Sequence, residues 1–397
     1  MAWPPNRRED EGSASPLPPL SGWFDKGLKR LGERLADDDS RHRLRASARR
    51  WTGRLWGWSA LAYALSLLLL LGGWRWIGEK NLTLAFLLYL PRQALLIPSA
   101  ALLFPAIFCH RPAAIVLVVA SLVFLFFGMD FRAVPESAPS PSEPGLSISV
   151  MTYNRGQHRN QSLQPFKNRT RPDLIAMQDA SGRASGYLGS EGYEEFSYAL
   201  DVAEFTLLSR YPIRSAEAVT LPGHSTPPIA ARFVVDFSGT DVAVYSVHTV
   251  SPRDTLLYYR RGAFLYGILG FPGSPLAEQR RANQVFWDRR IDEIRSLRDR
   301  VLADPLPVIL AGDFNAPAGG YIHGIVSRSF HDAHATAGSG FGFTFPGTTR
   351  NPISLGGPWM RIDYLFCDDS WRVVWCITEP DRPSQHRAVV AKFELRK

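Results

Sequence analysis

Cysteine is scarce in this chain, and its scarcity excludes two classes of protein. Only three of the 397 residues are cysteines: Cys109, Cys367 and Cys376. Three cysteines cannot form a disulfide framework, and their spacing matches no pattern of zinc ligands. We therefore expect three free thiols, which say little about the redox compartment.

Net charge is also small in the larger, C-terminal part of the chain. The formal net charge is +8, but residues 130–397 contribute only +1, from 29 basic and 28 acidic residues. The excess lies in residues 1–55, with 12 basic and 8 acidic residues, and in residues 56–129, with four basic residues and one acidic residue. Proteins that bind nucleic acid tightly carry a basic face. The even balance of the C-terminal part does not indicate such a partner, although it does not exclude a local basic patch.

Long apolar stretches are concentrated in residues 56–129. Leu55–Trp74 contains no charged residue, and two further stretches cover Leu82–Cys109 and Pro112–Met129. About 20 apolar residues suffice to cross the hydrocarbon layer of a bilayer, so we predict about three transmembrane helices here. The second stretch is interrupted by Pro91, Arg92 and Pro98. Because charge at membrane depth is costly, we expect this helix to begin after Arg92 or to hold Arg92 near the interface.

The first apolar stretch follows a basic segment that predicts its orientation. Six arginines lie between residues 41 and 54 with no acidic residue among them. Such segments stay in the cytoplasm, so residues 1–55 are predicted to be a basic cytoplasmic tail. Three spans then place everything after Met129 on the outer side, periplasmic or extracellular, of a bacterial inner membrane. If the middle stretch is re-entrant, the same part is cytoplasmic instead.

A change of composition follows the third apolar stretch. Residues 134–145 read VPESAPSPSEPG, and a segment dominated by proline and serine is typical of a semi-extended linker. We predict a linker over residues 130–145 and a separate body over residues 146–397.

Several apolar runs in this body end in a polar side chain. The runs lead to Asn154, Asp179, His248, Asp313, Asn315 and Asp363. Burying such groups without partners is costly, so we expect them to converge at one rim of a sheet. Helical patterns, clearest over Ala277–Leu302, lie between the runs and indicate an α/β or α+β body with helices on the sheet faces.

The order of these motifs carries a family resemblance. The motifs are Tyr153-Asn154, Gln178-Asp179, Ser209–Ile213, Val247-His248, Gly312–Asn315, Arg361–Tyr364 and Ser384–His386. Together they resemble the endonuclease/exonuclease/phosphatase superfamily, in a membrane-anchored bacterial-type member. The resemblance implies a deoxyribonuclease I-like fold: a four-layer α/β (α+β) sandwich of two packed mixed β-sheets flanked by helices, preceded by the all-helical transmembrane region.

The resemblance also implies hydrolysis of a phosphoester with the help of Mg²⁺ or Mn²⁺. Hard cations take oxygen ligands, often only one or two carboxylates together with substrate oxygens. By resemblance, Asp179 is the main metal carboxylate, and Asn154 supports the metal or the scissile phosphate.

Five further residues form the catalytic part of the implied site. His386 acts as a general base or stabilises the phosphate, and Asp363 fixes its tautomer and raises its basicity. Asp313 orients the attacking water, Asn315 positions water or phosphate, and His248 donates to a phosphoryl oxygen. Two structural alternatives stay open, because Asp and Asn favour turns and because His248 also fits a core histidine with its own partners.

Two departures from the family pattern leave a second function open. Asp179 stands where the family usually has Glu, and Gln385 stands where it usually has Asp. The enzyme reading is a membrane-anchored phosphodiesterase, nuclease or phosphatase. The alternative is a degenerate member that binds an anionic, phosphate-containing ligand without turnover. The aromatic-rich segment Asp254–Glu278 is interpreted as ordinary packing first, and as a substrate or membrane-touching loop second. Three neighbouring histidines, His323, His331 and His334, are expected in loops and not as ligands.

Overall fold

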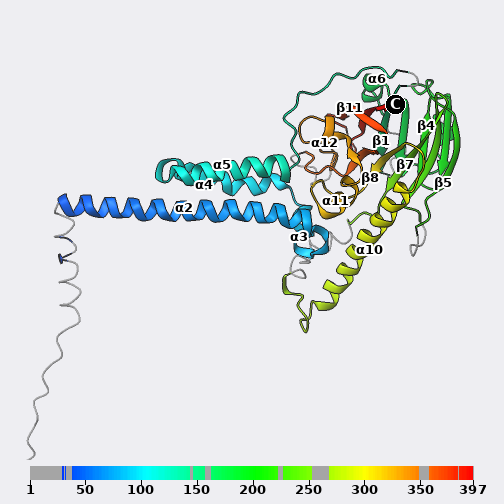
Figure 1. Ribbon diagram of the computed structural model, residues 1–397. Coiled ribbons are helices and arrows are strands. Elements are labelled where there is room, and N and C mark those ends of the chain that lie inside the picture. Colours follow the sequence, from blue (N-terminus) through cyan, green and yellow to red (C-terminus); the bar gives the residue numbers. More distant parts are fainter. Residues whose placement is uncertain are drawn as a thin grey trace, which may run out of the picture.

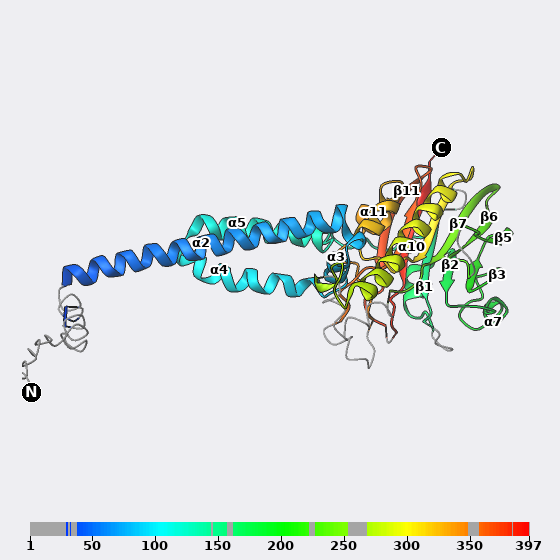
Figure 2. The same cartoon turned by 90° about the horizontal axis from the view of Figure 1, so that it is seen from below.

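The protein consists of an elongated helical bundle whose end docks on a rounded, two-sheet body (Figure 1, Figure 2). The computed structural model describes residues 29–30, 32, 38–143, 146–156, 162–221, 227–252, 268–347, 357–382 and 384–396. Most of the basic tail and most of the aromatic-rich segment lie outside these residues.

Three helices build the bundle: α2 (Asp38–Trp76), α4 (Ile97–Cys109) and α5 (Arg111–Val123). The turn η2 (Arg92–Leu96) leads into α4, and the π-helical turn η3 (Phe124–Gly128) continues α5. Three helical stretches are long and apolar enough to cross a membrane: His42–Trp76, Arg92–Cys109 and Arg111–Gly128. This agrees with the three apolar helices expected from the sequence.

The second apolar stretch divides into two elements. Its first part is the short helix α3 (Leu82–Leu88), whose N-terminal amides of Thr83 and Leu84 donate to the Asn81 side chain. Pro91 follows, and the residue before a proline disfavours helical backbone. The second of the long apolar helical stretches then begins at Arg92, and α3 lies beside the body (Figure 1).

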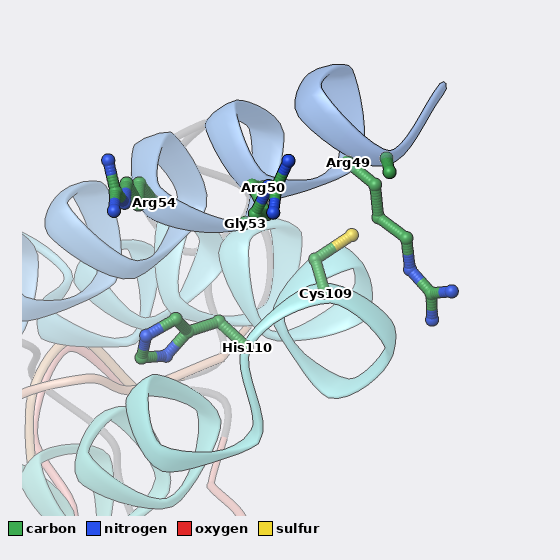
Figure 3. Close-up of a pocket in the computed structure, with 7 residues that line it drawn as sticks. Arg49, Arg50, Gly53, Arg54, Cys109 and His110 are labelled. Atoms are coloured by element: carbon green, nitrogen blue, oxygen red, sulfur yellow. The ribbon is translucent and has the colours of Figure 1, made fainter. Parts of the chain in front are cut away.

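Basic residues gather at the end of the bundle that is remote from the body. Figure 3 shows this end, where α2 passes the turn between α4 and α5. A shallow pocket there is lined by the basic side chains of Arg49, Arg50 and Arg54 together with Gly53, Cys109 and His110. A Cβ added to Gly53 would lie 3.0 Å from the Cys109 carbonyl oxygen, so glycine permits the close approach. Nδ1 of His110 accepts the Ala113 N–H at 3.2 Å and caps α5.

The body contains two six-stranded sheets. The first has the order β11 (Trp371–Thr378), β12 (Val389–Leu395), β1 (Ser147–Asn154), β2 (Leu174–Gln178), β4 (Phe205–Ser209) and β3 (Tyr198–Val202). The second has the order β5 (Ile213–Ala218), β6 (Ala230–Phe237), β7 (Thr240–His248), β8 (Val308–Asp313), β10 (Asp363–Cys367) and β9 (His331–Asp332). The pairs β1–β2 and β7–β8 are parallel and the other pairs antiparallel, so both sheets are mixed.

Alternating side chains place one core between the sheets and one on each outer face. In β1, Ile148 and Val150 join the inner core, whereas Met151 and Tyr153 join an outer core. Helices α6 (Phe166–Thr170) and α7 (Ala184–Tyr187) belong to the outer layer of the first sheet, and α10 (Ala277–Leu302) and α11 (Tyr321–Ser327) cover the second sheet (Figure 2). The predicted four-layer sandwich is confirmed. So is the predicted helix over Ala277–Leu302, which buries Ile291, Ile294, Leu297 and Val301.

The end of the helical bundle shares a core with the body. Trp74 and Leu88 belong to the same buried cluster as Trp287 of α10 and Ile322 of α11. The described part of the predicted linker runs along the body through polar contacts, such as the Trp375 Nε1–H donating to the Ser140 hydroxyl at 3.3 Å. The linker therefore joins the helical bundle and the body, which are already in contact. The sequence pattern did not predict this contact.

A buried ion cluster links Asp130, just after the third apolar helical stretch, to the second sheet. The Arg361 guanidinium, 2% exposed, donates to both Asp332 carboxylate oxygens, at 3.0 and 2.8 Å, and to Asp130. Although burial raises the pKa of Asp332, Arg361 and His323 lower it well below its ordinary value. Arg361 is the first residue of the motif Arg361–Tyr364, but its partners Asp332 and Asp130 lie outside the other motifs of the site.

Replacing Arg361 by leucine should destabilise the fold strongly. The change leaves two buried carboxylates without their cation, which costs about 3–5 kcal/mol, measurable by chemical denaturation of the detergent-solubilised protein. Because the folded pKa of Asp332 is depressed, its stabilising contribution is present above the ordinary pKa and is lost as pH falls. The difference between wild type and Arg361→Leu should therefore shrink below a pH of about 4. The control Arg372→Leu removes an exposed ion pair with Glu394 and should cost about 1 kcal/mol or less; equal losses in the two variants would refute the assignment.

Candidate active site

Strand register brings three of the predicted residues to one end of the second sheet. His248 of β7 and Asp363 of β10 both pair with Asp313 of β8, one on each side. In the first sheet, Asn154 ends β1 opposite Gln178, the last residue of β2. The polar ends of the two sheets face each other, so the predicted convergence at one rim is seen in the structure.

Asp313 lies at the centre of this cluster. Its Oδ2 accepts hydrogen bonds from the side-chain amides of Asn154, at 2.9 Å, and Asn315, at 3.1 Å. The same oxygen lies 3.8 Å from Nε2 of His248 and 3.8 Å from Nε2 of His386. The carboxylate is 1% exposed. Two amides and two imidazoles therefore surround a single buried oxygen.

The turn after β8 holds Asn315 in place. Its backbone N–H donates to Asp313 Oδ1 at 2.8 Å, and its φ of +47° lies in the left-handed region that asparagine tolerates. Its side-chain amide also donates to the Thr249 carbonyl at 2.9 Å. The motif Asp313–Asn315 therefore forms both a turn and part of the site. Its interpretation as a turn and its interpretation as a site motif are compatible.

His386 is oriented by Asp363. The Asp363 oxygens lie 3.1 and 3.2 Å from His386 Nδ1, so an Nδ1–H donor leaves Nε2 directed towards Asp313. Burial lowers the pKa of His386, but the carboxylates of Asp363 and Asp313 together raise it above its ordinary value. Burial raises the pKa of Asp363; the His386 imidazole opposes this and the Asp313 carboxylate adds to it.

His248 has the matching arrangement, with Glu204 as its partner. Its Nδ1 lies 3.2 Å from Glu204 Oε1, and its Nε2 lies 3.4 Å from the Asn154 amide nitrogen. Burial lowers the pKa of His248, but the hydrogen bond to Glu204 and the charges of Asp313, Glu204 and Asp179 raise it to about 9. This histidine lies beside the other site residues and is not enclosed in the apolar core.

Glu204 was missed by the sequence reading. It lies in the turn between β3 and β4, a place where a glutamate usually faces solvent. Its carbonyl accepts the Ala180 N–H at 2.9 Å, and the Thr206 hydroxyl donates to the Ala180 carbonyl at 2.7 Å. These bonds fix the turn against the residue after Asp179. Only the fold, and no local signal, brings Glu204 to the site.

The first of two possible metal-binding groups consists of Asp179, Glu204 and His248. One ligand atom from each lies within 4.8 Å of the others, and the residues are partly exposed. Burial and the neighbouring Glu204 raise the pKa of Asp179, although His248 opposes this. Two carboxylates that crowd each other at an open edge suit a hard divalent cation. The Asn154 amide oxygen, which accepts the Gly156 N–H at 2.8 Å, has a second lone pair for such an ion.

The second group consists of Asp313, Asp363 and His386, which are all buried. Across the described ranges, these two groups are the sets of three potential ligands that come this close together. In the second group, amides and an imidazole already occupy the carboxylate oxygens. The donor chemistry therefore favours the first group as the cation site.

Gln178 connects the two sheets just below the site. Its side chain is fully buried, donates to the Ser246 hydroxyl of β7 at 3.0 Å and faces the Thr152 hydroxyl at 3.4 Å. This bridge holds the end of β2 opposite the end of β7. The Gln385 side chain lies near Gly156, because a Cβ added there would lie 4.0 Å from Gln385 Oε1.

The three neighbouring histidines lie in regular elements, so the expectation of loops is wrong. His323 belongs to α11, His331 to β9 and His334 to α12 (Ala333–Ala337). Two of them hydrogen-bond to aspartates outside the site, and none belongs to a three-ligand group in the described part of the chain.

Removing the Glu204 charge should lower the pKa of His248. In Glu204→Gln the imidazolium loses its nearest anion, so its pKa should fall from about 9 towards the ordinary 6.5. Titration of ¹³C-labelled histidine by NMR, in EDTA, measures this shift. The control Glu194→Gln changes an exposed glutamate that accepts the Gly192 N–H. An unchanged His248 titration in Glu204→Gln would refute the pairing.

Comparisons with known proteins give a matching family profile and several similar solved structures. The sequence profile of the Endonuclease/Exonuclease/phosphatase family matches residues 154–386, which begin and end on site residues. No curated protein matches the chain. Similar solved structures include a family protein from Bacteroides thetaiotaomicron (14% identity, 63% of this chain, 98% of that chain, TM-score 0.43) and one from Beutenbergia cavernae (19%, 63%, 72%, 0.40). A third is the Neisseria 3′ phosphatase NExo bound to a product DNA hairpin (15%, 63%, 100%, 0.39). With the profile covering more than half of its length, the chain belongs to the endonuclease/exonuclease/phosphatase family.

Proposed function

We propose that the chain is a membrane-anchored, metal-dependent phosphoester hydrolase. The observation that carries this proposal is the pair of imidazoles, His248 and His386, each backed by a carboxylate and each directing Nε2 towards Asp313. Structural clusters do not require two such imidazoles around one carboxylate. Hydrolysis of a phosphoester does require donors for the phosphoryl oxygens and a positioned water.

The residues divide the work between binding and proton transfer. Asp179, with Asn154 and Glu204, would hold Mg²⁺ or Mn²⁺, which when bound supplies positive charge to the phosphoryl oxygens. His248 donates to a phosphoryl oxygen, and Asp363 holds His386 ready to accept a proton or to stabilise the phosphate. Asp313 and Asn315 orient the attacking water between the two imidazoles.

The alternative, a binding protein without turnover, rests on Asp179 and Gln385. A shorter carboxylate moves a cation by about 1 Å, and misplacement of that size can cost roughly 100-fold in rate. Glu204 beside Asp179 offsets this loss, because it places a second carboxylate at the same edge. We therefore favour the enzyme. Its substrate is a phosphodiester or phosphomonoester, and the near-neutral body does not favour tight binding of nucleic acid.

We further propose that the body lies on the outer side of a bacterial inner membrane. The basic end of the bundle lies opposite the body (Figure 1, Figure 3), and basic flanks stay in the cytoplasm. Three spans then carry the chain outward. A re-entrant middle stretch would place the body beside the basic end, which does not fit this arrangement.

The full chain should hydrolyse a phosphoester only with a divalent cation. Turnover of bis(p-nitrophenyl) phosphate, p-nitrophenyl phosphate and DNA is measured in detergent with Mg²⁺, Mn²⁺ or EDTA. Because His386 handles a proton in the transition state, His386→Gln should lower kcat/KM by about 100- to 10,000-fold. The control His331→Gln changes a half-exposed histidine paired with Asp369 and should have no effect. If only the double variant Asp179→Glu, Gln385→Asp turns over substrate, the binding alternative is correct.

Cys109 offers a direct test of the proposed orientation. It is exposed at the basic end, whereas Cys367 and Cys376 are buried. In intact spheroplasts, a membrane-impermeant maleimide should fail to label Cys109 and should label it after permeabilisation. In a Cys109→Ser background, Ser329→Cys on the exposed surface of the body should be labelled without permeabilisation. The reverse pattern would place the body in the cytoplasm.

A further inference from the structure

The segment between the first two spans makes unusual contacts with the site. It includes η1 (Gly78–Lys80), α3 and the residues up to Arg92. Three of its side chains, Glu79, Tyr89 and Arg92, are buried polar groups at the end of the helical bundle. Tyr89 and Arg92 bond to the loop that runs from the end of β8 to α11 and contains Asn315, and Glu79 bonds to the first residues of α11.

Tyr89 contacts the site loop most directly. Its hydroxyl donates to the Asn315 carbonyl at 2.7 Å, across 226 residues of sequence. Arg290 of α10 donates to the same carbonyl at 3.0 Å, to the Phe314 carbonyl at 3.1 Å and to the Tyr89 oxygen at 3.3 Å. The Asn315 carbonyl is therefore held by one donor from the membrane region and one from the body.

Arg92 and Glu79 hold the far end of the same loop. Arg92 Nη1 donates to the Ala318 carbonyl at 2.8 Å and to the Gly128 carbonyl at 2.5 Å, which joins the loop to the end of the third span. The Glu79 carboxylate accepts the N–H groups of Tyr321, at 2.8 Å, and Ile322, at 3.2 Å, at the start of α11. Backbone groups that lack a strand or helix partner thus depend on side chains of the membrane region.

We propose that Tyr89 is a positioning residue for the site, and that the segment Gly78–Arg92 is a brace that makes catalysis depend on the membrane anchor. This inference rests on the proposed function. Asn315 has left-handed backbone, and its side chain and N–H both bond to Asp313. A shift of the Asn315 carbonyl therefore moves the amide that orients Asp313. Tyr89 touches no reacting atom and acts through Asn315.

The brace also explains why the anchor and the body share one core. Trp359 Nε1 donates to the Tyr89 carbonyl at 3.4 Å, and Gln284 of α10 donates to the Lys80 carbonyl at 3.1 Å. The segment is therefore bonded to the body both at Tyr89 and at Lys80. A body without residues 1–129 would expose this surface and lose the donors to Asn315 and Ala318.

Tyr89→Phe tests the brace, because it removes one hydroxyl and keeps the ring. Tyr63→Phe is the matched control, since the Tyr63 hydroxyl bonds to the Leu95 carbonyl within the helical bundle. Both variants are made in the full chain in nanodiscs, and near-ultraviolet circular dichroism checks that they fold. Amide hydrogen exchange over residues 311–319 and steady-state kinetics with bis(p-nitrophenyl) phosphate and Mn²⁺ are compared with wild type.

Tyr89→Phe should exchange faster over residues 311–319 and lose about 10- to 100-fold in kcat with little change in KM, because misplacement of a site residue acts on the chemical step. Tyr63→Phe should match wild type in both measurements. If Tyr89→Phe matches Tyr63→Phe in exchange and in kcat, the inference is overturned. Wild type without turnover, together with faster exchange in Tyr89→Phe, overturns the proposed function but supports the brace.

Discussion

The buried carboxylate of Asp313 is the constraint on which the rest of the site depends. A carboxylate removed from water needs partners, and here they come from three directions: Asn154 from the opposite sheet, Asn315 from the turn after β8, and the two imidazoles of His248 and His386. Parallel pairing of β7 with β8 and antiparallel pairing of β10 with β8 place His248 and Asp363 level with Asp313. Folding the sandwich and assembling the site are therefore one process.

The N-terminal helical region also holds part of the site in place. The loop after β8 leaves the sheet, so its carbonyls need donors from elsewhere. Tyr89 and Arg92 of the N-terminal helical region and Arg290 of the body supply them. Under the proposed function, the site would be complete only when the N-terminal helical region is folded against the body.

The sequence predicted the three apolar helices from apolar runs, and it predicted the sandwich from the motifs that carry the family resemblance. The same motifs named seven candidate site residues, whose roles stay predictions. It did not predict Glu204, whose turn resembles any solvated hairpin and which reaches the site only through the pairing of β3 with β4. It also did not predict that Arg361, the first residue of the motif Arg361–Tyr364, forms buried ion pairs with Asp332 and Asp130. The contact between Tyr89 and Asn315 spans 226 residues. The spacing of apolar residues along the sequence does not indicate a contact of that range.

The central claim is that Asp179, Asn154 and Glu204 hold a catalytic cation beside Asp313. Anomalous diffraction from crystals of the full chain soaked in Mn²⁺ locates such an ion without reference to turnover. The account predicts a peak within bonding distance of the Asp179 carboxylate, on the side that faces Asp313. No peak at saturating Mn²⁺, or a peak only at a site remote from these residues, would contradict it.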